Sequence, residues 1–328
     1  MTEPADSYLP AEATGSAPGR GRLAGRRVLV VGAGTRPSPE PDPPVGNGRA
    51  IAILAAREGA SVVCADRDQA AAEVTAEMVR AEGARAEHVR ADNPRADNPR
   101  AGNFRAGNPR AEHVRADNAR ADNPRAGNFR ADAERVRAEV VVADVADSWS
   151  CATVVEDSIA ALGGLDGLVL NVGVAFGRGM AGTTAEQWDA TFAVNTRAHF
   201  LVSAAALPVL APGAAIVFIS SAASLRAATG VPAYDSSKAA LLGICRQVAR
   251  EGMTRHIRAN LVVPSLVDTP LGREASRLNP ARTAHRLPFG RQATAWEVAY
   301  ATVWLLSSEA SYVNAHPLVL DGGATSFA

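Results

Sequence analysis

A strand-like segment, a glycine-rich turn and a helix-like stretch follow one another near the N-terminus, and this order most constrains the fold. Residues 27–31 carry a short apolar run typical of a buried parallel strand. Gly32 follows, and Gly46-Asn47-Gly48 then opens a stretch whose apolar residues have helical spacing. Glycines let the backbone approach a ligand, and free N–H groups at a helix N-terminus attract anions. The order therefore predicts a dinucleotide-binding turn in an α/β fold.

A second strand-like segment, residues 61–66, ends in an acidic side chain, Asp66. A carboxylate about 20 residues past such a glycine turn can accept hydrogen bonds from ribose hydroxyls and repels a 2′-phosphate. Asp66 therefore favours NAD as the cofactor. Arg67 follows it, and a cation there can offset the repulsion, so NADP is not excluded.

Tyr234 and Lys238 lie four positions apart, which places them on one face of a helix. An ammonium beside a phenol favours the phenolate, so a group that normally titrates at about 10 can act as a base closer to neutral pH. Ser221 lies upstream, at the end of the preceding strand, and could hydrogen-bond a carbonyl or an alcohol. In an alanine-rich helix such a pair is more often a solvated lysine and a half-buried tyrosine, so its interpretation depends on the other motifs.

The motifs resemble, in order and spacing, those of the short-chain dehydrogenase/reductase family, from about Leu23 to Gly323. Besides the residues above, the resemblance is carried by Asp144-Val145, Asn171-Val172-Gly173, Asn195, Pro264, Val267, Thr269 and Asp321-Gly322-Gly323. It implies a Rossmann-type doubly wound parallel sheet in a single α/β domain, residues 23–328.

The resemblance also implies a catalytic set and a cofactor site. Tyr234 would be the general acid/base, Lys238 would lower its pKa and bind the nicotinamide ribose, Ser221 would position the substrate oxygen, and Asn195 would hold a water that relays protons. The implied cofactor-binding residues are Gly32, Gly46, Asn47, Gly48, Asp66, Arg67, Asp144, Val145, Asn171, Gly173, Tyr234, Lys238, Pro264, Val267 and Thr269. The cysteines and histidines show no metal-ligand spacing, so no metal site is expected.

One departure from the family lies inside the glycine turn, where thirteen residues separate Gly32 from Gly46. Residues 36–44 alternate proline with other residues, which favours an extended conformation and excludes a helix. The insertion adjoins the expected pyrophosphate site. It is either a lid over the cofactor or a solvated surface loop.

A second departure is a repeat of five residues over 85–134, in which residues 85–109 recur almost unchanged as 110–134. It resembles pentapeptide-repeat proteins, but the central position of nearly every unit is Asn or His, which is unsuited to an apolar interior. We therefore expect an insert over 85–136 that is disordered or loosely turned. Removing residues 88–139 would restore a short link at the amino ends of the strands, far from the chemistry.

Composition narrows the partners and the compartment. The 34 basic and 34 acidic side chains cancel, which gives no electrostatic case for nucleic acid or an anionic membrane. Residues 1–22 read as a flexible tail rather than a signal peptide, and no apolar run has the length of a membrane span. Three scattered cysteines suit the reduced thiols of a cytoplasmic protein.

The function expected from these observations is that of an NAD(P)(H)-dependent oxidoreductase that interconverts a secondary alcohol and a ketone, with NAD as the preferred cofactor. One alternative is a 3-oxoacyl-thioester (acyl-carrier-protein) reductase. Another is an interaction protein that uses the repeat and keeps an inactive Rossmann scaffold. The family resemblance further implies a homodimer or homotetramer, in which residues 186–210 and 233–252 form long helices against a second subunit.

Overall fold

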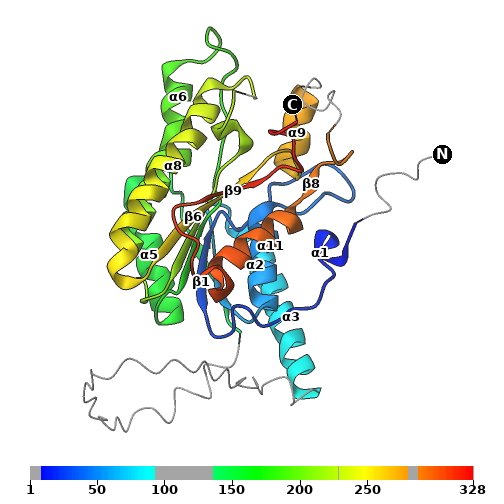
Figure 1. Cartoon of the computed structure of the whole chain (residues 1–328), viewed down its shortest axis with the longest axis vertical. Coiled ribbons are helices and arrows are strands. Elements are labelled where there is room, and N and C mark those ends of the chain that lie inside the picture. The colour runs from blue at the N-terminus through cyan, green and yellow to red at the C-terminus, as the bar shows by residue number, and fades with distance from the viewer. Residues whose placement is uncertain (1–8, 93–135, 228, 280–286, 328) are drawn as a thin grey trace, which may run out of the picture.

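A parallel sheet forms the centre of the computed structural model, which describes residues 9–92, 136–227, 229–279 and 287–327 (Figure 1). Its strands lie in the order β3-β2-β1-β4-β5-β6-β9, and every neighbouring pair is parallel. The strands are β1 (Arg27–Val31), β2 (Ser61–Asp66), β3 (Ala138–Val142), β4 (Gly167–Leu170), β5 (Ala215–Ile219), β6 (Arg258–Pro264) and β9 (Pro317–Leu320). The order reverses between β1 and β4, so the predicted doubly wound sheet is confirmed.

Helices cover both faces of the sheet. The helices α2 (Asn47–Arg57), α3 (Gln69–Asp92) and α11 (Ala295–Leu306) cover one face, and α5 (Ser148–Leu162), α7 (Ala198–Ala206) and α8 (Pro232–Gly252) cover the other. Side chains alternate along each strand, so that Val28 and Val30 of β1 enter the first core and Leu29 and Val31 the second. This double burial explains why the strands are apolar at nearly every position.

Shorter elements complete the chain around this frame. They are α1 (Ala11–Thr14), α6 (Ala185–Phe192), α9 (Pro270–Leu278) and a two-stranded ribbon of β7 (Val267–Asp268) and β8 (Ala293–Thr294). The single long helix predicted over 186–210 is wrong in one respect. A π-helical turn, Ala193–Arg197, separates α6 from α7.

The N-terminal segment packs against the domain, so the predicted flexible tail over 1–22 is wrong for residues 9–22. Ala13 is buried, and its carbonyl accepts a hydrogen bond of 2.7 Å from Thr294 Oγ1. The Arg57 guanidinium donates to the carbonyls of Gly15 and Ala17. Ala13 and Ala17 are both buried, although this segment has no long apolar run. Residues 1–8 lie outside the described residues.

The start of the repeat is helical, which corrects the expectation of disorder or loose turns from residue 85. Helix α3 continues through residues 85–92, whereas residues 93–135 lie outside the described residues. The chain re-enters the fold at Arg137, whose guanidinium donates to Leu162 O at 2.8 Å. The repeat is therefore joined to the amino end of β3, at the opposite end of the sheet from the glycine turn (Figure 1).

The excision of residues 88–139 considered above would cut into β3, which includes Ala138 and Glu139. Residues 85–87 repeat the sequence of residues 137–139, but they belong to α3. An excision that leaves both elements whole covers residues 93–135.

Candidate active site

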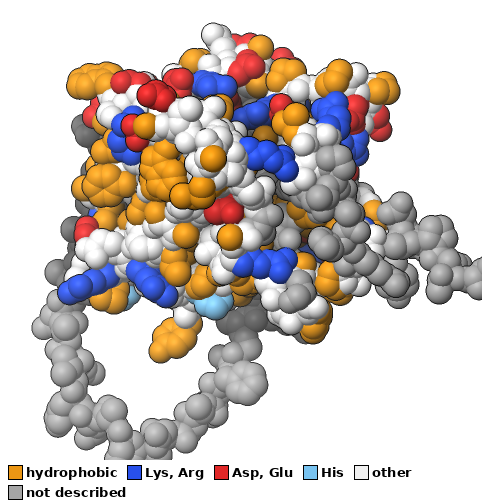
Figure 2. Space-filling model, turned by 90° about the horizontal axis from the view of Figure 1, so that it is seen from above, with side chains coloured by type: hydrophobic (Ala, Val, Ile, Leu, Met, Phe, Trp, Pro, Cys, Tyr) orange, Lys and Arg blue, Asp and Glu red, His pale blue; other side chains and the backbone are white. Residues whose placement is uncertain are grey.

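The predicted site residues gather at the carboxyl ends of the strands, near the reversal of strand order between β1 and β4. Such a reversal leaves a crevice in doubly wound sheets, because the connections leave the two strands in opposite directions. Figure 2 views the molecule from this end, where acidic and basic side chains are interspersed.

The glycine turn brings three backbone segments into close contact. Gly32 has a φ of 85°, which favours glycine, and a Cβ on it would lie 2.8 Å from Val172 Cγ1. A Cβ on Gly48, in the first turn of α2, would lie 1.8 Å from Gly32 O. Asn171 Nδ2 donates to that same carbonyl at 2.8 Å. Only glycines allow β1 and α2 to approach in this way.

The proline-rich insertion is closed at its base. Gly46 N donates to Thr35 Oγ1 at 3.2 Å, so the chain leaves the turn after Thr35 and returns at Gly46. Residues 36–45 form the excursion between these two points. The contact keeps Gly32, Gly46 and Gly48 together despite the added length.

Asp66 faces the glycine turn from the end of β2. Its Oδ2 accepts from Gly34 N at 2.9 Å and its Oδ1 from Asp68 N at 3.1 Å, while Arg67 is exposed. Arg49 of α2 is a nearby cation that sequence reasoning missed. Burial lowers the pKa of Arg49, and the charge of Asp66 acts in the opposite direction.

The two predicted cofactor-binding residues after β3, Asp144 and Val145, differ in exposure. Asp144 is exposed after β3, and its Oδ1 accepts from Ala146 N at 3.0 Å. Val145 is buried in the core beneath α5. The structure therefore leaves only the Asp144 side chain open to a ligand.

Asn195 lies within the π-helical turn and is fully buried. Its Oδ1 accepts from Val174 N, and its Nδ2 donates to Val174 O, both at 2.8 Å. Nδ2 also donates to Ser237 Oγ at 2.9 Å. The side chain thus ties the loop after β4 to α8. π-Turns of this kind occur often at functional sites.

Tyr234 and Lys238 lie in the first two turns of α8, and Lys238 Nζ lies 5.9 Å from the centroid of the Tyr234 ring. Nζ is buried and donates to Ile219 O at 2.9 Å. Burial lowers the pKa of Lys238 to about 8. A Cβ on Gly173 would lie 3.3 Å from Nζ, so a glycine there keeps the space around the ammonium open.

Ser221 follows β5 and begins a short 3-10 turn, Ala222–Ser224, that packs against α8. Its Oγ accepts from Ala223 N at 3.2 Å. The hydroxyl proton remains available as a donor. The structure therefore places Ser221, Asn195, Tyr234 and Lys238 around the start of α8.

The residues predicted after β6 have clear structural roles. Pro264 ends the strand, and Val267 is buried in β7. Thr269 caps α9, because its Oγ1 accepts from Gly272 N at 3.0 Å. Together these residues determine where the chain ends β6 and where α9 begins.

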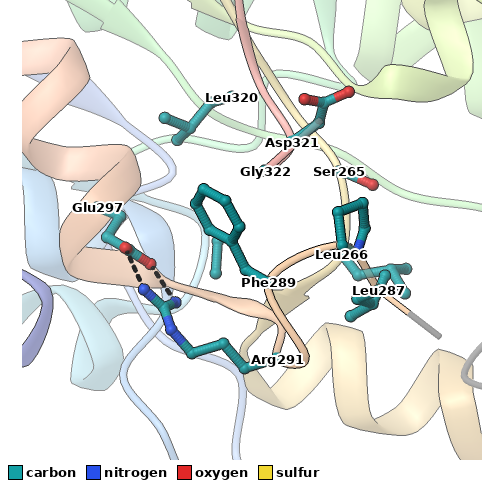
Figure 3. Close-up of a pocket in the computed structure, with 11 residues that line it drawn as sticks. Ser265, Leu266, Leu287, Phe289, Arg291, Glu297, Leu320, Asp321 and Gly322 are labelled. Carbon is teal, nitrogen blue, oxygen red and sulfur yellow. Dashed lines mark hydrogen bonds and ion pairs between the residues drawn. The ribbon is translucent and has the colours of Figure 1, made fainter. Parts of the chain in front are cut away.

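A small hollow lies beside this segment but apart from the catalytic set (Figure 3). Phe289 points into it, and Ser265, Leu266 and Leu320 line it. The Arg291 guanidinium and the Glu297 carboxylate of α11 close one side through hydrogen bonds of 2.7 and 2.9 Å. The hollow contains no residue of the catalytic set.

His199 of α7 is a buried titratable group that sequence reasoning missed. Its Nδ1 lies 3.3 Å from Val194 O in the π-helical turn, and its Nε2 is buried without a hydrogen-bond partner among the described residues. Burial, and then the charge of Lys238, lower its pKa to about 3. The ring is therefore neutral beside the lysine. Nothing in the sequence pattern distinguishes it from an ordinary core position.

We expect the unfolding free energy of the wild type to fall more steeply than that of His199→Leu as pH drops below 6.5. The unfolded histidine takes up a proton there, whereas the folded one, with its pKa of about 3, does not. The unfolded state then binds more protons, so stability is lost as pH falls, by about 1.4 kcal/mol per pH unit. Urea unfolding at several pH values measures both slopes, and parallel slopes would contradict the assignment.

Two further features concern metals and membranes. The described ranges contain no group of three or more His, Cys, Asp or Glu side chains able to hold a metal ion. None of their helices is both long and apolar enough to span a bilayer.

The parallel sheet, the glycine turn and the Tyr234–Lys238 pair define a Rossmann-type oxidoreductase, and the comparisons identify its family. A family model described as "Enoyl-(Acyl carrier protein) reductase" matches residues 112–325. The chain is 37% identical to 2-(R)-hydroxypropyl-CoM dehydrogenase of Xanthobacter autotrophicus, over 56% of this chain and 77% of that protein. It is 30% identical to the 3-oxoacyl-[acyl-carrier-protein] reductase of Thermotoga maritima, over 57% and 77%.

A solved structure extends the match to nearly the whole chain. A crystal structure described as that of "a putative short-chain dehydrogenase/reductase from Burkholderia xenovorans" superimposes with a TM-score of 0.71 at 30% identity, over 94% of this chain and 99% of that one. The chain belongs to the short-chain dehydrogenase/reductase family. It is accordingly an NAD(P)-dependent oxidoreductase that acts on CH–OH groups.

Proposed function

We propose that the protein interconverts a secondary alcohol and a ketone with NAD(H). The observation that carries the proposal is Tyr234 beside the buried ammonium of Lys238, on the same edge of the sheet as the glycine turn. A phenol next to a buried cation is suited to exchanging a proton with a substrate oxygen.

The residues of the turn fit a dinucleotide. Gly48 leaves room for the backbone where a Cβ would collide with Gly32 O, and the N-terminus of α2 presents N–H groups there. Asn47 Oδ1 is buried without a partner among the described residues, so it can accept from a hydroxyl of a ligand. The residues proposed to hold the cofactor are Gly32, Gly46, Asn47, Gly48, Asp66, Arg67, Asp144, Val145, Asn171, Gly173, Tyr234, Lys238, Pro264, Val267 and Thr269.

The chemistry divides between the cofactor and the chain. When bound, the nicotinamide supplies or accepts the hydride. Tyr234 gives a proton to the ketone oxygen in reduction and takes it back in oxidation. Ser221, whose Oγ already accepts from Ala223 N, donates a hydrogen bond to the same oxygen and keeps its proton. Lys238 donates one N–H to Ile219 O. Its other N–H groups are proposed to face Tyr234 and to hydrogen-bond a ribose of the cofactor.

The Asn195 side chain is already hydrogen-bonded within the protein, so its contribution to this proton path is to hold the backbone in place. Its amide is occupied by Val174 and Ser237, which fixes the π-helical turn beside Lys238. We propose that the backbone of this turn holds the water that exchanges protons with Lys238.

Cofactor choice provides one test of the proposal. We expect the wild type to prefer NADH over NADPH, because Asp66 lies at the end of β2 where a 2′-phosphate would meet its charge. Asp66→Ala should reduce that preference by about tenfold, the equivalent of about 1.4 kcal/mol. Catalytic efficiencies with both cofactors measure the ratio. A wild-type preference for NADPH would refute the NAD assignment, with Arg49 and Arg67 as the cations responsible.

A 3-oxoacyl-thioester reductase is the second candidate, and the similarity to the reductase of Thermotoga maritima favours it. A panel that contains simple cyclic and linear ketones and a 3-oxoacyl thioester separates the two. Turnover of the thioester alone would select this candidate.

We also propose a homodimer or homotetramer in the cytoplasm. Phe200 of α7 is 53% exposed and adjoins a hollow lined by Phe192 and Ile244, which a second copy could cover. The cysteines are free and buried, and burial raises the pKa of Cys64 to about 12. Such thiols suit a reducing compartment.

A further inference from the structure

The proline-rich excursion, residues 36–45, and helix α9 carry matched charges on the surfaces that meet. Arg273 of α9 forms an ion pair with Glu40 of the excursion. Arg36 lies 3.6 Å from Glu274, the next residue of α9. Each segment thus contributes one cation and one anion, in a crossed arrangement.

Arg273 is the centre of this contact. Its Nε and Nη2 donate to the two carboxylate oxygens of Asp268 at 2.6 and 2.8 Å, while Nη1 reaches Glu40. Asp268 belongs to β7, immediately before the Thr269 cap of α9. The guanidinium therefore connects the excursion both to α9 and to the strand that anchors it.

The topology places this contact across the carboxyl edge of the sheet. The excursion follows β1 and α9 follows β6, whereas β4 and β5 lie between those two strands. In Figure 1 the loop between β1 and α2 reaches α9 at this edge. The residues after β4 and β5 include Asn171, Gly173 and Ser221, so strands that carry site residues lie between the two strands that precede these segments.

The excursion is also suited to holding a fixed shape. It contains five prolines, at positions 37, 39, 41, 43 and 44, and its base is closed by Thr35 and Gly46. Prolines restrict the unfolded and open conformations, so less entropy is lost when the loop is held against α9.

We propose that residues 36–45 and α9 form a clasp that retains the bound nucleotide, with Arg273 as its positioning residue. The inference rests on the proposed nucleotide site at the glycine turn. The clasp adjoins two parts of that site, because the excursion starts at the glycine turn and α9 begins directly after its cap, Thr269. Opening it separates Glu40 from Arg273 and Arg36 from Glu274.

The expected size of the effect follows from the exposure of these groups. The Arg273 and Glu40 side chains are 38% and 29% exposed, so solvent screens their attraction. Ion pairs between partly exposed side chains each contribute only modestly to the stability of a contact. Breaking the cluster should therefore speed nucleotide dissociation by about threefold to tenfold, and salt should reduce the difference.

The test measures NADH dissociation from the full-length protein by stopped-flow fluorescence. Arg273→Gln should release NADH about threefold to tenfold faster than the wild type. Arg36→Glu and Glu274→Arg should each speed release, and the double exchange should restore it to within about twofold, because the pair is re-formed with reversed charges.

Arg27→Gln is the matched control. The Arg27 guanidinium donates two hydrogen bonds to Asp166, of 2.7 and 3.2 Å, at the amino end of the sheet. Its loss should leave NADH release unchanged. Tight NADH binding with equal release rates in the wild type, Arg273→Gln and the single charge reversals would overturn the clasp alone. Failure of the wild type to bind either NADH or NADPH would overturn the proposed function and the clasp together.

Discussion

Replacing Tyr234 by phenylalanine should lower turnover by at least about a hundredfold while leaving NADH binding intact. The substitution removes only the phenolic oxygen, the group proposed to exchange a proton with the substrate. The ring remains beside Lys238, whose Nζ lies 5.9 Å from its centroid, and the fold of α8 is unaffected. The loss should therefore be in turnover, with little change in the affinity for NADH.

Steady-state rates with the ketone panel and fluorescence titration with NADH measure the two quantities separately. Tyr312→Phe is the matched control, because Tyr312 is fully exposed and lies outside the site. It should leave both quantities unchanged. Tyr234→Phe activity within a few-fold of the wild type would remove Tyr234 from the proposed role.

Gly48→Ala is expected to weaken cofactor binding by about a hundredfold, the scale on which a displacement of about 1 Å costs function. The added Cβ would lie 1.8 Å from Gly32 O, and the obstacle is backbone rather than the end of a flexible side chain. Helix α2 must then move away from β1. The N–H groups at its N-terminus move with it, away from the position of a diphosphate.

Gly243→Ala provides the control for this substitution. Gly243 lies in α8, and a Cβ on it would meet no atom within 4 Å. Alanine there should stabilise the helix by about 0.5–1 kcal/mol and leave cofactor affinity unchanged. NADH titration and thermal unfolding of both variants complete the comparison. A Gly48→Ala protein that binds NADH within a few-fold of the wild type would contradict the tight approach of α2 to β1.

The sheet and the placement of the motifs could be predicted because they depend on local patterns. Buried parallel strands are apolar at consecutive positions, as in β1 and β5, and the glycine turn needs residues that lack a Cβ at Gly32 and Gly48. The family resemblance then assigned roles that no pattern alone could give. Those roles remain predictions for the individual residues.

The features that could not be predicted depend on contacts distant in sequence. The π-helical turn contains Asn195, whose side chain is hydrogen-bonded to Val174 and Ser237, and neither partner is close to it in the sequence. The docking of Ala13 relies on Thr294, far along the chain. The pairing of Glu40 with Arg273 likewise joins segments whose sequences are polar and uninformative alone.

The closed base of the proline-rich excursion also has a consequence for protein engineering. Gly46 N and Thr35 Oγ1 lie 3.2 Å apart, so the two ends of the excursion meet as the ends of a tight turn do. Peptides of other lengths could be grafted between these residues without moving the glycines, since each doubling of loop length costs only about 0.6 kcal/mol. A sensor peptide or an affinity tag inserted there would lie directly beside the proposed nucleotide site.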